Sequence, residues 1–369
     1  MRINDYVLYA LLLGASTMLS LGLTEAMRRL ALRWNILDQP VGRKAHAAPT
    51  PLLGGAAIFC TFYFMVLGYF AVAFFTHELG MNYLEREMLG FLGEDGGWKM
   101  TGILLGGVMI FLLGVVDDMH VLRPRMKLLG QIVTAATVVA FGMRAKVFVF
   151  NDPWSSSLVT MLWLVLIINS MNLLDNMDGL SGGVAIIAAA TYFLCVQPIE
   201  DEKMVRLLLL IFAGSVAGFL WHNRPPARIF MGDCGAMFNG YFLATVALVG
   251  TFHVEGTHGG SRIAVAAPLL ALSVPLFDTF SVIYIRWRNG DSIFLGDKRH
   301  FSHRLVALGM TKPLAVGFIL LVGALVGMNG ALLPQLDTWG TMIVLAQTGG
   351  IFMLIVLLMW VGRTGGGRP

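Results

Sequence analysis

Long apolar segments separated by short polar turns constrain this chain more than any other feature. About 20 consecutive apolar residues cross a bilayer as a helix, and the sequence has about eleven such segments. Hydrophobic residues make up 57% of the 369 positions and charged residues only 13%, against roughly 25% charged residues in soluble domains. We therefore expect an all-α, polytopic integral membrane protein with a single domain over residues 1–369. The predicted spans are 6–27, 52–75, 101–116, 128–143, 158–172, 183–197, 204–222, 237–253, 264–285, 314–333 and 341–361.

The distribution of basic residues predicts the orientation, because Lys and Arg concentrate in cytoplasmic loops. An outer N-terminus places most of the 26 Lys and Arg residues in inner segments and the acidic runs 85–95 and 200–202 outside. Eleven spans then leave the C-terminus in the cytoplasm, and ten spans are the alternative count. The first apolar run follows the start without a small-residue cleavage site, so we expect an uncleaved first helix.

Two features exclude other classes of function. The net charge of +4 is small and spread over short loops, so we expect no nucleic-acid partner. The three cysteines, Cys60, Cys195 and Cys234, lack the spacing of a metal site or a disulfide framework.

Acidic residues gather at the predicted inner ends of the spans. Asp117 and Asp118 end the third span, Asp175 and Asp178 follow the fifth, and Asp233 lies in a glycine-flanked turn before the eighth. Ionisable groups at membrane depth usually have a function or a partner. Adjacent carboxylates repel unless a cation lies between them. Mg²⁺ suits such a site, because it binds one or two carboxylates together with substrate phosphates.

Basic and imidazole groups share the same predicted face, where they suit phosphate groups. They are Arg43, Lys44 and His46 in the first inner loop, Lys127 in the second, and Arg299, His300, His303 and Arg304 in the fifth. Zinc binding by the two histidines of the fifth loop is disfavoured, because no thiolates accompany them. Phe230 could stack on a base or pack in the core. Acids and cations at one interface favour a Mg²⁺–nucleotide-diphosphate substrate, and the membrane location suggests a lipid as the second substrate.

Six motifs in this order resemble those of the polyprenyl-phosphate N-acetylhexosamine-1-phosphate transferase family. They are R-K-A-H-A-A-P-T-P-L-L-G-G at 43–55, G-V-V-D-D-M at 114–119 with K-L-L-G-Q at 127–131, N-L-L-D-N-M-D-G-L at 172–180, F-M-G-D-C-G-A-M-F at 230–238, P-L-F-D-T at 275–279 and H-F-S-H-R-L at 300–305. The last motif is similar to the H-x-H-H-R pattern of the N-acetylglucosamine-type (WecA/TagO-like) branch, with Ser302 in place of the usual middle histidine. Asn176 and Met177 are variable positions of the third motif.

The resemblance implies transfer of a sugar-1-phosphate from a UDP-sugar to undecaprenyl or another polyprenyl phosphate. UMP is released, and the lipid-linked diphosphate sugar serves cell-envelope glycan synthesis, such as that of lipopolysaccharide or teichoic acid. N-acetylglucosamine is the expected sugar. The resemblance further implies Mg²⁺ as cofactor, with Mn²⁺ as a substitute, and a bacterial cytoplasmic membrane protein with its site on the cytoplasmic face. It leaves a homodimer open.

The resemblance also assigns roles to individual residues. Asp233 is the expected direct Mg²⁺ ligand, with Asp118 and Asp175 near the metal. Asp117 is the candidate base, and Asp118, Asp175 and His300 complete the catalytic set. The expected substrate-binding residues are Lys44, His46, Lys127, Asn172, Asp178, Asn223, Phe230, His303 and Arg304; of these, Asp178, Asn223 and Phe230 are expected to hold uracil. Ser302 is expected close to the sugar.

Three alternatives come from other substrates or classes. The muramyl-pentapeptide translocase (MraY) of the same family usually has a run of three histidines that this chain lacks. An ion-coupled transporter would place its acids near the bilayer midplane, often on broken helices within inverted repeats, and no repeat is visible here. A non-catalytic scaffold would not need five acids at helix ends.

The topology gives the first prediction. Tags at the N-terminus and within 85–95 should be accessible from outside, and tags within 290–298 and at the C-terminus from the cytoplasm. Labelling of intact and permeabilised cells with an impermeant reagent measures this. External labelling of a C-terminal tag would contradict the count of eleven and move the motifs off a common face.

Overall fold

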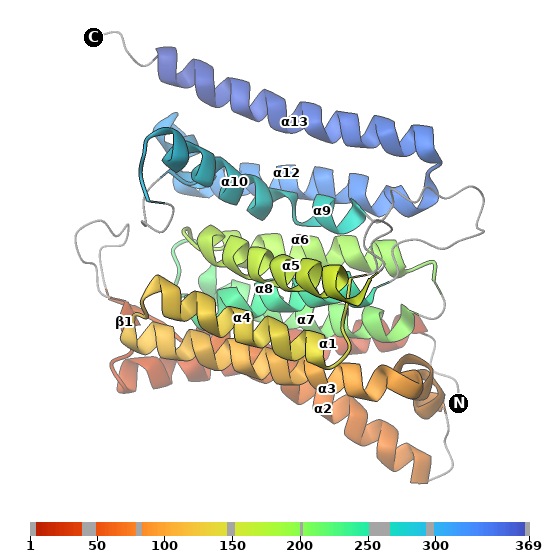
Figure 1. Ribbon diagram of the computed structural model, residues 1–369. Helices are drawn as coiled ribbons and strands as arrows, with labels where there is room; N and C mark the ends of the chain where they lie inside the picture. The colour runs from red at the N-terminus through yellow and green to blue at the C-terminus, as the bar shows by residue number, and fades with distance from the viewer. Residues whose placement is uncertain are drawn as a thin grey trace.

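The computed structural model describes residues 5–38, 49–78, 83–145, 152–199, 202–250, 266–292 and 299–365, and these form a bundle of α-helices (Figure 1). The helices are α1 (Asp5–Arg33), α2 (Gly54–Glu78), α3 (Tyr83–His120), α4 (Pro124–Ala140), α5 (Pro153–Leu174), α6 (Leu180–Val196), α7 (Lys203–Asn223), α8 (Gly232–Val249), α9 (Ala267–Ala271), α10 (Ser273–Arg288), α11 (Phe301–Ala307), α12 (Lys312–Leu332) and α13 (Thr338–Gly365), with a short 3-10 turn, η3 (Leu333–Gln335), before α13. Two short strands, β1 (Leu37–Asp38) and β2 (Thr50–Pro51), pair antiparallel, with Leu37 opposite Pro51.

Every predicted apolar span except the ninth corresponds to one helix, so the all-α fold is confirmed. Within the described residues, seven helices (α1, α2, α3, α5, α7, α12 and α13) are long and apolar enough to cross a membrane. The third and fifth spans are longer than predicted, because α3 and α5 continue into the polar residues at their ends. The number of spans and the orientation of the termini stay predictions.

The ninth predicted span is not one helix, which corrects the sequence-based expectation. It is divided into α9 and α10 at Leu272, whose backbone leaves the helical region (φ −103°, ψ 16°). Pro275 lies in the first turn of α10. A proline has no N–H to donate, so a helix continuing from α9 would lose a hydrogen bond at this position.

The turns that carry the acidic motifs lie at one end of the bundle. The helices run side by side with roughly parallel axes, and α1 begins at the end opposite to that where α13 finishes (Figure 1). The connections after α3, α5, α7 and α10 share the end where α13 finishes. This alternation brings together motifs that are far apart in the sequence.

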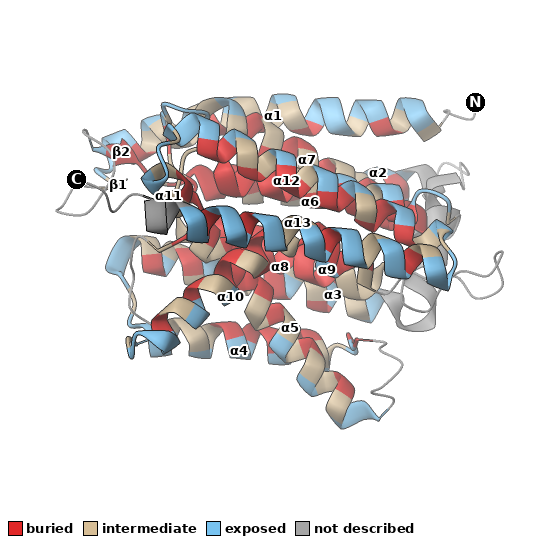
Figure 2. Cartoon of the chain, turned by 90° about the horizontal axis from the view of Figure 1, so that it is seen from above, coloured by how far each residue is buried: buried red, intermediate tan, exposed pale blue. Residues whose placement is uncertain are grey.

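The helices at the centre of the bundle, α6, α7 and α8, are the most buried, whereas α13 lies at the edge and is mostly exposed (Figure 2).

Glycines let α2 and α3 approach the start of α8 closely. A Cβ added to Gly55 would lie 2.1 Å from the Gly235 nitrogen, and one added to Gly114 would lie 2.3 Å from the Cys234 Cα. Small residues allow such backbone contact between membrane helices. This packing fixes the first turn of α8 against the last turns of α3.

Hydrogen bonds between polar groups link α4, α5 and α8. Gln131 of α4 and Asn169 of α5 exchange two hydrogen bonds, of 3.3 and 2.6 Å. The Trp163 indole donates to the Ala244 carbonyl at 3.0 Å and links α5 to α8. In a bilayer no water would satisfy these groups, so the pairs favour this one arrangement of α4, α5 and α8.

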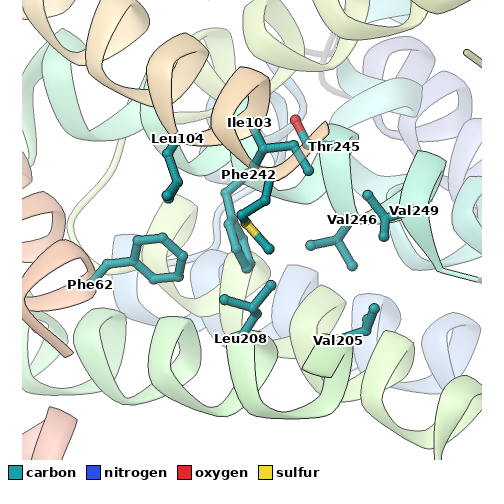
Figure 3. A pocket seen from close by; sticks show the side chains of 10 residues that line it. Phe62, Ile103, Leu104, Val205, Leu208, Phe242, Thr245, Val246 and Val249 are labelled. Atoms are coloured by element: carbon teal, nitrogen blue, oxygen red, sulfur yellow. The ribbon is translucent and has the colours of Figure 1, made fainter. Parts of the chain in front are cut away.

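An apolar pocket lies between α2, α3, α7 and α8 (Figure 3). Phe62, Leu104, Leu208 and Phe242 line it, together with further apolar side chains and Thr245. None of the acidic residues singled out from the sequence lines this pocket. It lies along the helices rather than at the end that holds the motifs, so the candidate site is located from the polar contacts.

Candidate active site

Five segments bring their acidic and basic side chains to one end of the bundle. They are the end of α3, the start of α4, the turn between α5 and α6, the start of α8, and the start of α11 with its partner on α10. We name the first four the acidic cluster, which consists of Asp117, Asp118, Lys127, Asp175, Asp178 and Asp233. We name His300 and the polar residues of α11 the α11 arm.

A lysine lies between two carboxylates of the acidic cluster. Lys127 Nζ is 2.6 Å from Asp117 Oδ2 and 3.1 Å from Asp233 Oδ1. The Leu122 amide donates to Asp117 Oδ1 at 2.6 Å, which closes the tight turn between α3 and α4. Asp117 is only 6% exposed, so an unpaired negative charge there would be costly. Lys127, predicted to contact phosphate, therefore also holds Asp117 and Asp233 together.

Asp118 caps the start of α8. Its Oδ1 accepts from the Asp233 amide at 2.7 Å and its Oδ2 from the Cys234 amide at 3.1 Å. The first amides of a helix have no partner within the helix, and a carboxylate satisfies them and the helix dipole. Gly232 has φ +74°, and a Cβ on it would come within 2.7 Å of Asp118 Oδ2. The absence of a side chain at Gly232 thus allows the close approach of Asp118.

The third motif forms the turn between α5 and α6. Asp175 follows the last residue of α5, and Asp178 Oδ2 accepts from the Ala227 amide at 3.0 Å. Gly179 starts α6 with φ +76°, a conformation that glycine adopts without strain. The turn therefore presents Asp175 and Asp178 from a backbone that is held to the segment between α7 and α8.

Asn223 links the turn between α5 and α6 to the connection between α7 and α8. Its Oδ1 accepts from the Gly179 amide and its Nδ2 donates to the Ile229 carbonyl, both at 2.9 Å. The side chain is buried, so in this structure Asn223 positions the turn between α5 and α6 relative to the start of α8. Its contact with uracil stays a prediction.

The first and fourth motifs are joined through their backbones. The Gly54 amide donates to the Phe230 carbonyl at 3.0 Å, the Gly55 amide to the Met231 carbonyl at 2.8 Å, and the Phe230 amide to the Pro51 carbonyl at 2.8 Å. The first amides of α2 are thus satisfied by the segment that leads into Asp233. The Phe230 ring is half-buried, and its stacking on a base stays a prediction. Lys44 and His46 lie outside the described residues.

The α11 arm is fixed by an acid on α10. His300 Nδ1 lies 2.8 Å from Asp278 Oδ2, and the Phe301 amide donates to Asp278 Oδ1 at 2.5 Å. Asp278 is thus paired on both of its carboxylate oxygens. Arg304 Nη2 donates to Ser281 Oγ at 2.6 Å. The sequence marked Asp278 only as a costly intramembrane acid; the structure shows that it orients His300.

The histidines do not form a metal site here. The rings of His300 and His303 are 6.4 Å apart between centroids. In the described part of the chain, no three His, Cys, Asp or Glu side chains lie close enough together to hold a metal ion. A zinc pair at these two histidines therefore gains no support.

The negative charges around Asp175 are poorly neutralised by neighbouring groups. Burial raises the pKa of Asp175 to about 8, and the negative charges of Asp233, Asp118 and Asp178 add to this rise. Burial and neighbouring like charges both disfavour an ionised carboxyl. The turn therefore disfavours a negative charge on Asp175, and a bound cation would allow this carboxyl to ionise.

The donor set fits Mg²⁺. All the carboxylates offer hard oxygen atoms, and the Asn172 Oδ1, one turn before Asp175, is buried without a hydrogen-bond partner among the described residues. Mg²⁺ usually takes one or two carboxylates and completes its shell with water and substrate phosphate. The three predicted ligands, Asp118, Asp175 and Asp233, interact electrostatically in this cluster, which suits such an open site.

Comparison with known proteins agrees with this geometry. A model of glycosyl transferase family 4 matches residues 100–251, the stretch that contains the whole acidic cluster. A probable undecaprenyl-phosphate N-acetylglucosaminyl 1-phosphate transferase of Bacillus subtilis is 30% identical over 352 residues, 93% of this chain and 88% of that protein. The decaprenyl-phosphate N-acetylglucosaminephosphotransferase of Mycobacterium tuberculosis is 31% identical, over 91% of this chain and 85% of that protein. The undecaprenyl-phosphate alpha-N-acetylglucosaminyl 1-phosphate transferase of Escherichia coli is 23% identical, over 83% and 78%.

The pKa of Asp175 predicts how stability depends on pH. The folded protein favours the neutral carboxyl up to about pH 8, whereas the unfolded chain ionises near pH 4. The folded state thus binds the proton more tightly, and stability falls as pH rises between these values. Asp175→Asn should remove this part of the dependence. Melting temperatures from pH 5 to 9 in detergent with a chelator should show the wild type falling relative to the variant. Parallel curves would contradict the raised pKa.

Proposed function

The chain belongs to glycosyl transferase family 4, within the polyprenyl-phosphate N-acetylglucosaminyl-1-phosphate transferases, and on that premise we propose that it transfers N-acetylglucosamine-1-phosphate from UDP-N-acetylglucosamine to undecaprenyl or a related polyprenyl phosphate. An oxygen of the lipid phosphate attacks the phosphorus that carries the sugar. The bond from that phosphorus to the bridging oxygen breaks, UMP leaves, and a lipid-linked diphosphate sugar forms.

The observation that supports this proposal is the meeting of the acidic cluster and the α11 arm at one end of the bundle. Such a transfer brings several negative phosphates together, so it requires cations and oriented donors around the reacting phosphorus. Lys127 and the basic residues of α11 supply positive charge from the protein. Bound Mg²⁺, held by Asp233 and Asp175, would supply the remainder and stabilise charge on the phosphate oxygens.

The contacts within the acidic cluster suggest different roles for its residues. Asp118 holds Asp233 in place, because both of its oxygens accept amides of the first turn of α8. Asp117 remains the candidate base, kept ionised by the adjacent Lys127. A lipid phosphate is already an anion near neutral pH, so the reaction demands little of that base. His300, His303 and Arg304 are proposed to hold the diphosphate or the sugar.

The cellular setting follows from the distribution of charge. Basic residues at the end that carries the motifs favour a cytoplasmic location for the site and a bacterial cytoplasmic membrane for the protein. A UDP-sugar is a soluble, charged substrate, and a polyprenyl phosphate is held in the bilayer. A site at the ends of membrane helices is placed where the two substrates can meet.

An assay with defined substrates tests the proposed function. Purified protein with Mg²⁺, undecaprenyl phosphate and UDP-N-acetylglucosamine should form a lipid whose mass equals the lipid phosphate plus one N-acetylglucosamine-phosphate unit. Formation of that product should stop when the metal is chelated. Efficient use of UDP-N-acetylmuramoyl-pentapeptide without use of UDP-N-acetylglucosamine would instead favour the muramyl-pentapeptide reaction.

The role of Asp233 gives a second test. Asp233→Asn keeps the size of the side chain but removes a hard anionic ligand, so we expect kcat to fall by about 100-fold or more. Asp152→Asn is a matched control, because Asp152 is an exposed cap at the start of α5, at the other end of that helix from Asp175. Turnover of Asp233→Asn close to that of the control, at ordinary Mg²⁺ concentrations, would remove Asp233 from the metal site.

A further inference from the structure

A part-buried hydrogen bond joins the two halves of the candidate site. Ser302 Oγ of α11 donates to Asn176 Oδ1, between Asp175 and Asp178, at 2.5 Å. Ser302 is 1% exposed. The Ser302 hydroxyl is directed to the turn between α5 and α6, and its closeness to the sugar stays a prediction.

The surroundings of Ser302 explain why a hydroxyl can be buried there. Phe301 and Leu305 are its buried neighbours on α11, and the Phe301 ring packs edge-on against Phe277 of α10. A hydroxyl among apolar side chains is costly without a hydrogen-bond partner. Asn176 supplies the acceptor.

Asn176 is itself held in place. Its Nδ2 donates to the Leu173 carbonyl at 2.9 Å, and its backbone amide donates to the Leu174 carbonyl at 2.8 Å. The acceptor of the Ser302 hydroxyl is therefore anchored to the end of α5. Movement of α11 away from the turn would break a part-buried hydrogen bond rather than a mobile surface contact.

The other hydrogen bonds of the arm lead to α10. Asp278 accepts from the Phe301 amide and pairs with His300, and Ser281 accepts from Arg304. These contacts fix α11 relative to α10, whereas the Ser302 hydroxyl contacts the turn of the acidic cluster directly. The Ser302–Asn176 hydrogen bond supplies a second constraint.

We propose that Ser302 and Asn176 act as a positioning pair that sets the separation between the acidic cluster and the basic α11 arm, and so controls how the nucleotide sugar is held. Neither residue needs to contact the reacting atoms. This inference rests on the proposed function, in which both groups contact the UDP-sugar. It predicts that loss of the pair lowers kcat/KM for the UDP-sugar and leaves the KM for the lipid phosphate unchanged.

A double-mutant cycle tests the pair. Ser302→Ala, Asn176→Ala and the double variant are compared with the wild type in kcat and in KM for each substrate. Each single change should lower kcat/KM for UDP-N-acetylglucosamine about tenfold, the effect of one lost part-buried hydrogen bond. The double variant should be little worse than either single one, because residues in contact are not additive. The KM for polyprenyl phosphate should stay unchanged. Ser170→Ala is the control, since that buried hydroxyl on α5 has no partner among the described residues.

Several results would overturn the proposal. Additive losses, equal losses for both substrates, or single variants that behave like Ser170→Ala would each do so. If Ser302→Ala does not fold, the half-buried Asn176→Ala must show the shift in KM for the UDP-sugar alone. The cycle is also measured on melting temperature, which does not depend on activity. A wild type that transfers no sugar phosphate refutes the proposed function, and additive melting temperatures would then separately refute the pair.

Discussion

The capping of α8 by Asp118 is the interaction on which the rest of the candidate site depends. It ties the last turn of α3 to the first turn of α8 and places Asp233 beside Lys127 and Asp117. Three glycines allow this contact. Gly232 takes a left-handed backbone conformation, and Gly114 and Gly55 leave space for Cys234 and Gly235. In a bilayer, unpaired helix amides and unpaired carboxylates are both costly. Here each group satisfies the other, and the acids stay at the helix ends.

The carboxylates of the acidic cluster are neutralised unevenly, and this difference relates the fold to the proposed chemistry. Lys127 neutralises charge between Asp117 and Asp233, whereas Asp175 lies among like charges. A site that satisfied every carboxylate internally would have no need of a cation from solution. Under the proposed function, a divalent ion that arrives with the substrate phosphates would allow Asp175 to ionise. The α11 arm, held by Asp278 and Asn176, lies beside the same turn.

The sequence predicted the helices and the acidic residues well, because apolar length and intramembrane charge are local signals. It predicted neither the break between α9 and α10 at Leu272 nor most of the hydrogen-bond partners of the polar side chains. Asp118 and the Asp233 amide are 115 positions apart, and Ser302 and Asn176 are 126 apart. Such pairs depend on how helices pack, which one sequence does not specify. For the same reason the sequence did not indicate that Lys127 pairs with Asp117 and Asp233, that Asn223 holds the turn, or that Ser302 bonds to Asn176. The contacts of these residues with substrate stay predictions.

The central claim is that the acidic cluster binds a divalent cation together with the phosphates of a UDP-sugar. Anomalous scattering from crystals grown with Mn²⁺ and UDP-N-acetylglucosamine measures this directly, since Mn²⁺ takes oxygen ligands like those of Mg²⁺. The claim predicts one manganese peak at Asp175 and Asp233 that weakens when the nucleotide sugar is omitted. A manganese peak at His300 and His303, or an empty acidic cluster with the nucleotide bound elsewhere, would contradict it.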